Sequence, residues 1–442
     1  MEDKLEGAAN ASLPLSSRPA LFEKRDSRRS INVDFVFLLI AVTFAFSLGF
    51  GYLLEKYLKM PWMFSALFLG ILFSSFGLFQ TTIQDETFNV LSTMGMLFLL
   101  FMIGFNLEMG QMRRFGTQIL KGAILIVSLE AAIVGALLFF LFPTEVGSSP
   151  LVAMVVALSF ATVGEAVLLP ILAKFNLLRT KFGQLTLGIG TLDDVLEVLT
   201  LIMIPFLPIF LPTLRIQGFP DPAYVVLDLI GIFLLTFILV KIASKIKHVL
   251  SNNINFGFIR PLVVMLIFFS FVVIGSFVFE SLAAISAIFG GIVARSLLPT
   301  ENFRSDEKVV NFLGYIVLSP MFFLSVGASM SFVSIFLYPL LIGVILLSTI
   351  GAKLSGAFLL FRKMLGRKHS LLLGLGLSVR FSTGLIVQYV LLLSGLITLE
   401  LYSALIASAV IMTPLILVML PYALCREKDS LCIERPPPPT LT

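Results

Sequence analysis

Long apolar runs separated by short polar loops dominate the chain from residue 33 to residue 421. Thirteen such runs can be drawn, and most approach the roughly 20 residues that a helix needs to cross a bilayer. Their apolar residues are continuous rather than alternating, which argues against a transmembrane β-barrel. Because lipid offers the backbone no hydrogen-bond partners, each run is predicted to be helical. The segments are 33–54, 61–80, 88–106, 117–142, 150–174, 183–205, 224–247, 257–279, 283–298, 308–330, 336–361, 369–394 and 400–421.

Composition agrees with an all-α polytopic membrane protein. Of 442 residues, 58% are hydrophobic and 13% charged, whereas soluble domains carry about 25% charged residues. The two cysteines, Cys425 and Cys432, lie near the C-terminus, and the two histidines, His248 and His369, lie in expected loops. This spacing provides neither a disulfide framework nor a transition-metal site. We therefore expect no cofactor and no enzymatic activity.

Loop charges predict the orientation in the membrane. Lysine and arginine gather in the loops after odd-numbered segments, whereas the loops after even-numbered segments contain Arg215 alone. The positive-inside rule then places the C-terminus in the cytoplasm, and an odd number of helices places the N-terminus outside. Residues 1–32 form a polar tail without a secretory signal, and residues 422–442 form a cytoplasmic tail. A bacterial or archaeal cell membrane is the expected location.

Seven ionisable residues fall well inside the apolar segments. Each costs several kcal/mol at the bilayer centre unless it is paired or hydrated, so such residues are functional candidates. The acids belong to the fourth to sixth segments and the bases to the eleventh and twelfth, which predicts that the two groups face each other. They are Glu130, Glu165, Asp193, Asp194 and Glu197, with Lys353 and Arg380.

The two charged groups also indicate an internal repeat. Segments four to six and eleven to thirteen are seven segments apart, and an odd offset inverts the topology, as in many secondary transporters. The middle segments contain "SFATVGEAV" (159–167) and "SVRFSTGLI" (378–386), which predict two broken helices crossing near the midplane. Glu165 and Arg380 are then candidates to compensate the exposed helix ends. The alternative is a pair of small-residue packing faces.

The adjacent aspartates are the strongest candidates for an ion site. Neighbouring helical residues point about 100° apart, so Asp193 and Asp194 are expected to divide between a protein partner and an aqueous cavity. Lys353 is the candidate partner, and Glu197 borders the same surface one turn on. Carboxylates this close must hold a proton or a cation, which is the chemistry of ion–proton exchange. A purely structural ion pair is the alternative, and for Glu130, Glu165 and Glu197 it is an equally good interpretation.

These residues resemble a known family. The run "LLRTKFGQLTLGIGTLDDVLEVL" (177–199) is similar to the signature region of the monovalent cation:proton antiporter-2 family, which includes Kef-type and NapA-type exchangers. The segments "GFNLEMGQMRRFG" (104–116), "SPMFFLSVGASM" (319–330) and "GAKLSGA" (351–357) agree with it. The resemblance covers about residues 33–421.

The resemblance implies an NhaA/NapA-like fold with thirteen helices. Residues 117–205 and 336–421 would form a mobile ion-transport core, residues 33–106 and 257–330 a dimerising scaffold, and residues 224–247 a linker helix. Asp193 would pair with Lys353, and Asp194 would bind the cation and proton. Paired aspartates favour the Na⁺-type, electrogenic branch over Kef-type members, which usually carry glutamine first.

The expected function is exchange of Na⁺, or of Li⁺ or K⁺, for H⁺ by alternating access. Thr162, in the broken fifth segment, is expected to contribute oxygen to the cation shell. The expected partners are the cation, protons, membrane lipid and a second copy of the chain, with no nucleic acid.

Three other functions fit part of this pattern. A Kef-type K⁺/H⁺ antiporter and a sodium-coupled organic-anion symporter would share the fold. An intramembrane aspartyl protease would need two aspartates converging from different helices, whereas this chain supplies both from one.

Overall fold

The computed structural model describes residues 34–58, 60–106, 116–178, 180–207, 222–253, 259–277, 280–298, 303–380 and 384–432, and within these ranges the secondary structure is helical. The predicted N-terminal tail, most of the segment 104–116 and residues 433–442 of the predicted C-terminal tail lie outside the described residues.

The first half of the chain follows the predicted segments closely. A first helix, Asp34–Tyr57, becomes a π-helix at Ser47–Gly51 and Leu54–Leu58. The next helices are α2 (Phe64–Phe76), α3 (Gln80–Ile83), α4 (Glu86–Asn106), α6 (Thr117–Leu141), α7 (Pro150–Phe160), α8 (Glu165–Lys174) and α9 (Lys181–Met203), with 3-10 turns at Thr144–Val146 and Ile204–Phe206. The second predicted segment is shorter than expected because Gly77, at φ 67°, ends α2 in the left-handed conformation that glycine tolerates.

The second half begins with α11 (Pro222–Asn253), which is longer than the predicted linker. It continues with α12 (Ile259–Ser276), α13 (Glu280–Leu297), α14 (Phe303–Asn311), a π-helix η5 (Phe312–Leu318), α15 (Ser319–Ala328) and α16 (Phe332–Leu337). The chain ends in α17 (Pro339–Leu377), α18 (Gly384–Leu393) and α19 (Leu399–Cys432). The tenth predicted segment therefore combines α14, η5 and α15.

The prediction of a polytopic helical membrane protein is confirmed, although its helix count is not. Seven helices in the described ranges are long and apolar enough to cross a membrane, and five shorter apolar helices accompany them. One of the seven is α17, which covers the eleventh predicted segment and the start of the twelfth. The count of thirteen stays a prediction.

The basic run at residues 362–368 was expected to be a loop between two segments. The chain is helical on both sides of Gly366, but this residue, at φ 82° and ψ 167°, breaks the helix, so α17 consists of two helices joined at a kink inside that run. One boundary differs from the sequence analysis, because α19 continues to Cys432, into the predicted tail. Hydropathy marks where a helix leaves the bilayer, whereas the helix itself can continue into the polar region.

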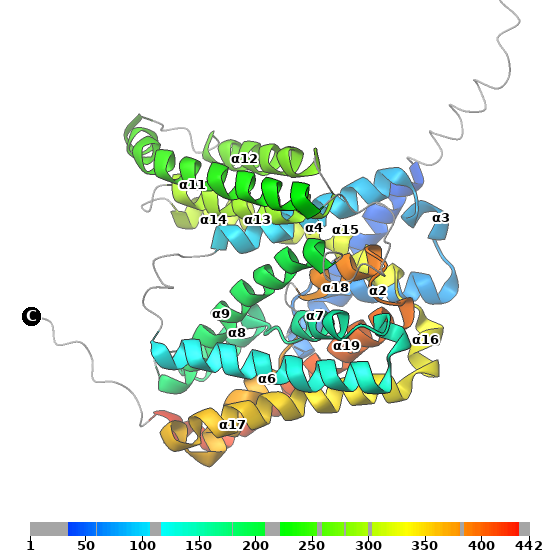
Figure 1. Cartoon of the computed structure of the whole chain (residues 1–442), viewed down its shortest axis with the longest axis vertical. Helices are drawn as coiled ribbons and strands as arrows, with labels where there is room; N and C mark the ends of the chain where they lie inside the picture. Colours follow the sequence, from blue (N-terminus) through cyan, green and yellow to red (C-terminus); the bar gives the residue numbers. More distant parts are fainter. Residues whose placement is uncertain are drawn as a thin grey trace, which may run out of the picture.

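The helices gather into two groups. Figure 1 shows α6 and α17 side by side along one edge of the molecule, with α7, α9 and α19 next to them. Along the opposite edge, α12 and α13 pack against each other, and α13 packs on α4. Between them, α15 packs on α2. The interrupted helices, α7 with α8 and α17 with α18, belong to the first group.

Candidate functional site

Both helix breaks predicted from the sequence are present, and they touch. The fifth segment stops at Phe160 and resumes at Glu165, and the twelfth stops at Leu377 and resumes at Gly384. The Gly164 N–H donates to the Val379 carbonyl at 2.8 Å, which joins one break to the other. The crossing of two broken helices is therefore a feature of this structure.

Close approach of the two broken segments depends on Gly384. A Cβ at this position would lie 2.5 Å from the Ser159 carbonyl oxygen and 2.6 Å from the Thr162 hydroxyl oxygen. Real Cβ atoms do not come so near, so only glycine lets the start of α18 rest on the break after α7.

Lys353 closes the carbonyl ends of both interrupted helices. From the middle of α17, its ammonium nitrogen donates to the carbonyls of Ala161 and Leu377 at 2.7 Å each, and to that of Thr162 at 3.4 Å. These carbonyls lie where α7 and α17 end, so they lack intrahelical partners and carry the negative end of the helix dipole. Lys353, which is fully buried, therefore performs a compensation that the sequence analysis assigned to Glu165 and Arg380.

Arg380 also compensates the carbonyl groups at the break after α7. Its guanidinium donates to the Thr162 carbonyl and lies 4.6 Å from the centroid of the Phe160 ring. Its own carbonyl accepts a hydrogen bond from the Thr413 hydroxyl of α19 at 2.9 Å. Arg380 is thus held in the break by contacts on both sides, as expected for a residue that compensates a helix end.

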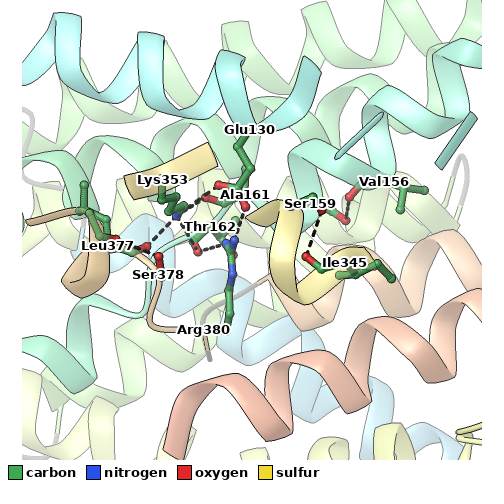
Figure 2. A network of polar contacts seen from close by, with 12 residues as sticks. Glu130, Val156, Ser159, Ala161, Thr162, Ile345, Lys353, Leu377, Ser378 and Arg380 are labelled. Atoms are coloured by element: carbon green, nitrogen blue, oxygen red, sulfur yellow. Dashed lines mark hydrogen bonds and ion pairs between the residues drawn. The ribbon is translucent and has the colours of Figure 1, made fainter. Parts of the chain in front are cut away.

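Glu130 joins the two bases. This carboxylate, fully buried on α6, accepts a hydrogen bond from the Arg380 guanidinium, and its second oxygen lies 3.5 Å from the Lys353 nitrogen. Figure 2 shows the three side chains meeting around the carbonyls of Ala161 and Thr162. The sequence analysis left Glu130 open between a functional acid and a structural ion pair. Its position in the middle of α6, at the depth of Lys353, was the available signal.

Asp193 completes the buried cluster without a direct ion pair to Lys353. Its side chain is 1% exposed. It interacts with the Val163 N–H, and the charges of Lys353, Arg380 and Glu130 act on it. In this conformation the carboxylate that contacts Lys353 is that of Glu130. Asp193 therefore interacts with Lys353 through charge but without a direct ion pair, and Glu130 is the acid that contacts the lysine.

Asp194 occupies a different environment from its neighbour. It is half-buried, and it interacts electrostatically with Tyr315 of η5, in the other group of helices. Asp193 and Asp194 thus differ in exposure, in the direction of the expected split between a protein partner and an aqueous cavity. Asp193 lies inside the cluster, while Asp194 lies where α9 faces the neighbouring group.

The remaining candidates lie around this cluster. Thr162 is buried, and its carbonyl is used by Lys353 and Arg380 while its hydroxyl faces Gly384. Glu197 is also buried, one turn after Asp193 on α9. Glu165 begins α8, but its side chain lies outside the described residues.

Comparison with known proteins gives a consistent result. A model of the family described as "Sodium/hydrogen exchanger, transmembrane" matches residues 28–422. A Na⁺/H⁺ antiporter from Enterococcus hirae is 25% identical over 396 residues, covering 87% of this chain and 97% of its own length. A probable Na⁺/H⁺ antiporter of Methanocaldococcus jannaschii is 25% identical over 389 residues, covering 85% of this chain and 94% of its own length. The high-affinity Na⁺/H⁺ antiporter NhaS3 of Synechocystis is 25% identical over 343 residues, covering 75% and 70%.

The fold has a counterpart among solved structures. The sodium proton antiporter MjNhaP1 of Methanocaldococcus jannaschii superposes with a TM-score of 0.59 at 18% identity, covering 91% of this chain and 99% of the other. The chain is therefore an integral membrane protein that belongs to the transmembrane sodium/hydrogen exchanger family, a family of transporters rather than enzymes.

Proposed function

We propose that the chain is a secondary antiporter that exchanges Na⁺ for H⁺ by alternating access. The observation that carries this proposal is the position of Asp194. It is a half-buried carboxylate beside a cluster in which two acids, Glu130 and Asp193, already face two bases, Lys353 and Arg380. A further carboxylate at this place can hold Na⁺ or a proton in turn, and competition between them couples the two fluxes. The family match supports the same function.

The exchange is proposed to be electrogenic, with both aspartates carrying protons. Protonation of Asp193 would leave Lys353 beside Glu130, 3.5 Å away, so the lysine keeps an anionic partner. Two protons moved against one Na⁺ transfer net charge. The paired aspartates and Lys353 also favour a place in the monovalent cation:proton antiporter-2 branch of the family.

Thr162 is the proposed source of a further oxygen ligand for the cation. The Thr162 carbonyl is engaged by Lys353 and Arg380, which leaves the Thr162 hydroxyl as its contribution to a hard-ion shell. Glu197, one turn from Asp193, is an accessory acid in this proposal.

The wider organisation is also part of the proposal. Residues 117–205 and 336–421 form the moving core, residues 33–106 and 257–330 the scaffold, and residues 224–247 the linker. The scaffold would dimerise within the lipid of a bacterial or archaeal cell membrane, with the C-terminus in the cytoplasm and the N-terminus outside. The excess of basic residues in the loops after odd-numbered segments supports this orientation.

K⁺/H⁺ exchange of the Kef type is the nearest alternative, because the same carboxylates could select K⁺. A sodium-coupled symporter of an organic anion is less well supported. Such a substrate needs cationic partners, but Lys353 and Arg380 already bind helix-end carbonyls and Glu130. Proton–cation exchange in liposomes without any organic substrate would exclude it.

Transport by purified protein in proteoliposomes tests the proposal. Wild-type protein should release protons on addition of Na⁺, faster when an imposed membrane potential favours the net charge movement. Asp194→Asn should reduce the signal to background, because a neutral amide can neither bind a proton nor balance Na⁺. Asp34→Asn, an exposed acid at the start of the first helix, is the matched control and should keep the wild-type rate. Full activity of Asp194→Asn would refute the site, and equal rates at all potentials would refute electrogenic exchange. Parallel assays with Li⁺ and K⁺ identify the cation.

A further inference from the structure

Close glycine contacts join most of the described helices into two groups. At the α2–α15 seam, a Cβ on Gly70 or Gly327 would lie 2.1–2.2 Å from a carbonyl oxygen of the other helix. At the α4–α13 seam, the values for Gly104 and Gly291 are 1.9–2.0 Å. Backbones in such direct contact cannot slide past one another, because packed interiors have no free volume.

The second group is joined in the same manner. Gly384 rests on the Ser159 carbonyl, and a Cβ on Gly374 would lie 2.7 Å from the carbonyl oxygen of Lys353. Every close contact of a described glycine stays within one group, either residues 34–106 with 259–330 or residues 116–206 with 339–426. These contacts support the proposed division into scaffold and core.

Between the groups, hydroxyl groups form hydrogen bonds alongside apolar packing. The Tyr402 hydroxyl of α19 donates to the Val326 carbonyl of α15 at 3.2 Å. The Tyr389 hydroxyl of α18 lies 3.3 Å from the Ser325 hydroxyl, also on α15. Just beyond α15, the Ser331 N–H donates to the Ser403 hydroxyl oxygen at 2.9 Å.

These three bonds lie together at one end of the interface. Tyr402 is fully buried and its ring centroid is 6.3 Å from that of Tyr389, which in turn meets the Phe322 ring edge-on at 5.8 Å. It is the end at which α15 stops and α19 starts, the outer end in the proposed orientation. Side-chain hydrogen bonds of this kind can open and re-form, whereas glycine seams cannot.

We propose that Tyr389, Tyr402 and Ser403 of the core form a latch with Ser325, Val326 and Ser331 that closes the outer end of the core–scaffold interface in this conformation. The inference rests on the proposed alternating-access function and adds the contacts that must break before the site opens outward. Each hydroxyl contact is worth little by itself, so the latch holds one state without trapping the transporter in it.

Reversible crosslinking tests the latch. In a background with Cys425 and Cys432 replaced by serine, S325C/Y389C is joined by a short thiosulfonate crosslinker that reducing agent cleaves. S319C/M63C is the matched control, because the Ser319 hydroxyl and Met63 sulfur are 3.9 Å apart and both lie inside the scaffold. Crosslinking S325C/Y389C should abolish Na⁺-driven proton release and reduction should restore it, while the crosslinked control keeps its activity. Undiminished exchange by crosslinked S325C/Y389C overturns the latch, as does failure of this pair to crosslink where the control pair does.

A second measurement needs no transport, so it separates failure of the latch from failure of the proposed function. Val326→Cys keeps the backbone carbonyl that Tyr402 uses and places a thiol at a fully buried position. Adding Tyr402→Phe should raise its labelling by an impermeant maleimide from the outer side by roughly two- to tenfold, the range expected for one hydrogen bond. Leu324→Cys, in the scaffold seam with α2, should be unaffected. Unchanged labelling at residue 326 overturns the latch even if exchange is normal, whereas a cysteine-free parent without exchange counts against the proposed function.

Discussion

At the scale of single residues, the most consequential side chain is Glu130. It contacts both buried bases, so it holds two cations in a region where an unpaired charge is very costly. Glu130→Gln should therefore destabilise the protein by about 3–5 kcal/mol, the cost of removing one partner from a buried ion pair. Thermal unfolding in detergent would measure this. Glu86→Gln, at an exposed acid in the first turn of α4, should cost less than about 1 kcal/mol.

A double substitution distinguishes charge from shape at the same position. If lost charge balance causes the destabilisation, Glu130→Gln combined with Arg380→Gln should cost clearly less than the sum of the single changes, because one anion and one cation are then removed together. Simple additivity, or wild-type stability of Glu130→Gln alone, would contradict the role assigned to Glu130.

At the scale of elements, the crossing of the two broken helices depends on a glycine. Gly384→Ala would place a methyl group 2.5 Å from the Ser159 carbonyl oxygen and 2.6 Å from the Thr162 hydroxyl oxygen. The break should open, with a loss of about 1–3 kcal/mol from overpacking and a marked fall in exchange rate. Gly351→Ala is the control, since a Cβ there meets nothing within 4 Å and alanine favours the helix. Equal behaviour of the two variants in unfolding and transport assays would show that the close approach is unimportant.

The same scale shows what the sequence could and could not predict. The breaks were predictable, because small and polar residues interrupt an apolar run in corresponding segments of an inverted repeat. The contact of Lys353 with Glu130 was not predictable. Periodicity fixes depth along one helix, but it does not fix how α6, α9 and α17 are rotated against each other, and that rotation decides between Glu130 and Asp193. The separation of the eleventh and twelfth segments was predictable from the basic run at residues 362–368, and Gly366 breaks α17 there.

At the scale of the whole molecule, the property to test is whether the chain crosses the membrane an odd or an even number of times. An odd number places the two termini on opposite sides, and the loop charges place the C-terminus in the cytoplasm. Cys425, exposed near the end of α19, is a native probe of that side. With Cys432 replaced by serine, an impermeant maleimide should label Cys425 in everted vesicles and not in right-side-out ones.

The N-terminal tail provides the second half of this test. Ser12→Cys, in a background with both native cysteines replaced by serine, should give the opposite pattern, with labelling in right-side-out vesicles. If both probes react from the same side, the number of crossings is even and the thirteen-segment reading fails. If Cys425 reacts from outside, the loop charges of this chain do not follow the positive-inside rule, and the hydroxyl latch would close the cytoplasmic end of the interface instead of the outer one. The side that labels Cys425 therefore decides which end of the core–scaffold interface, outer or cytoplasmic, the latch closes.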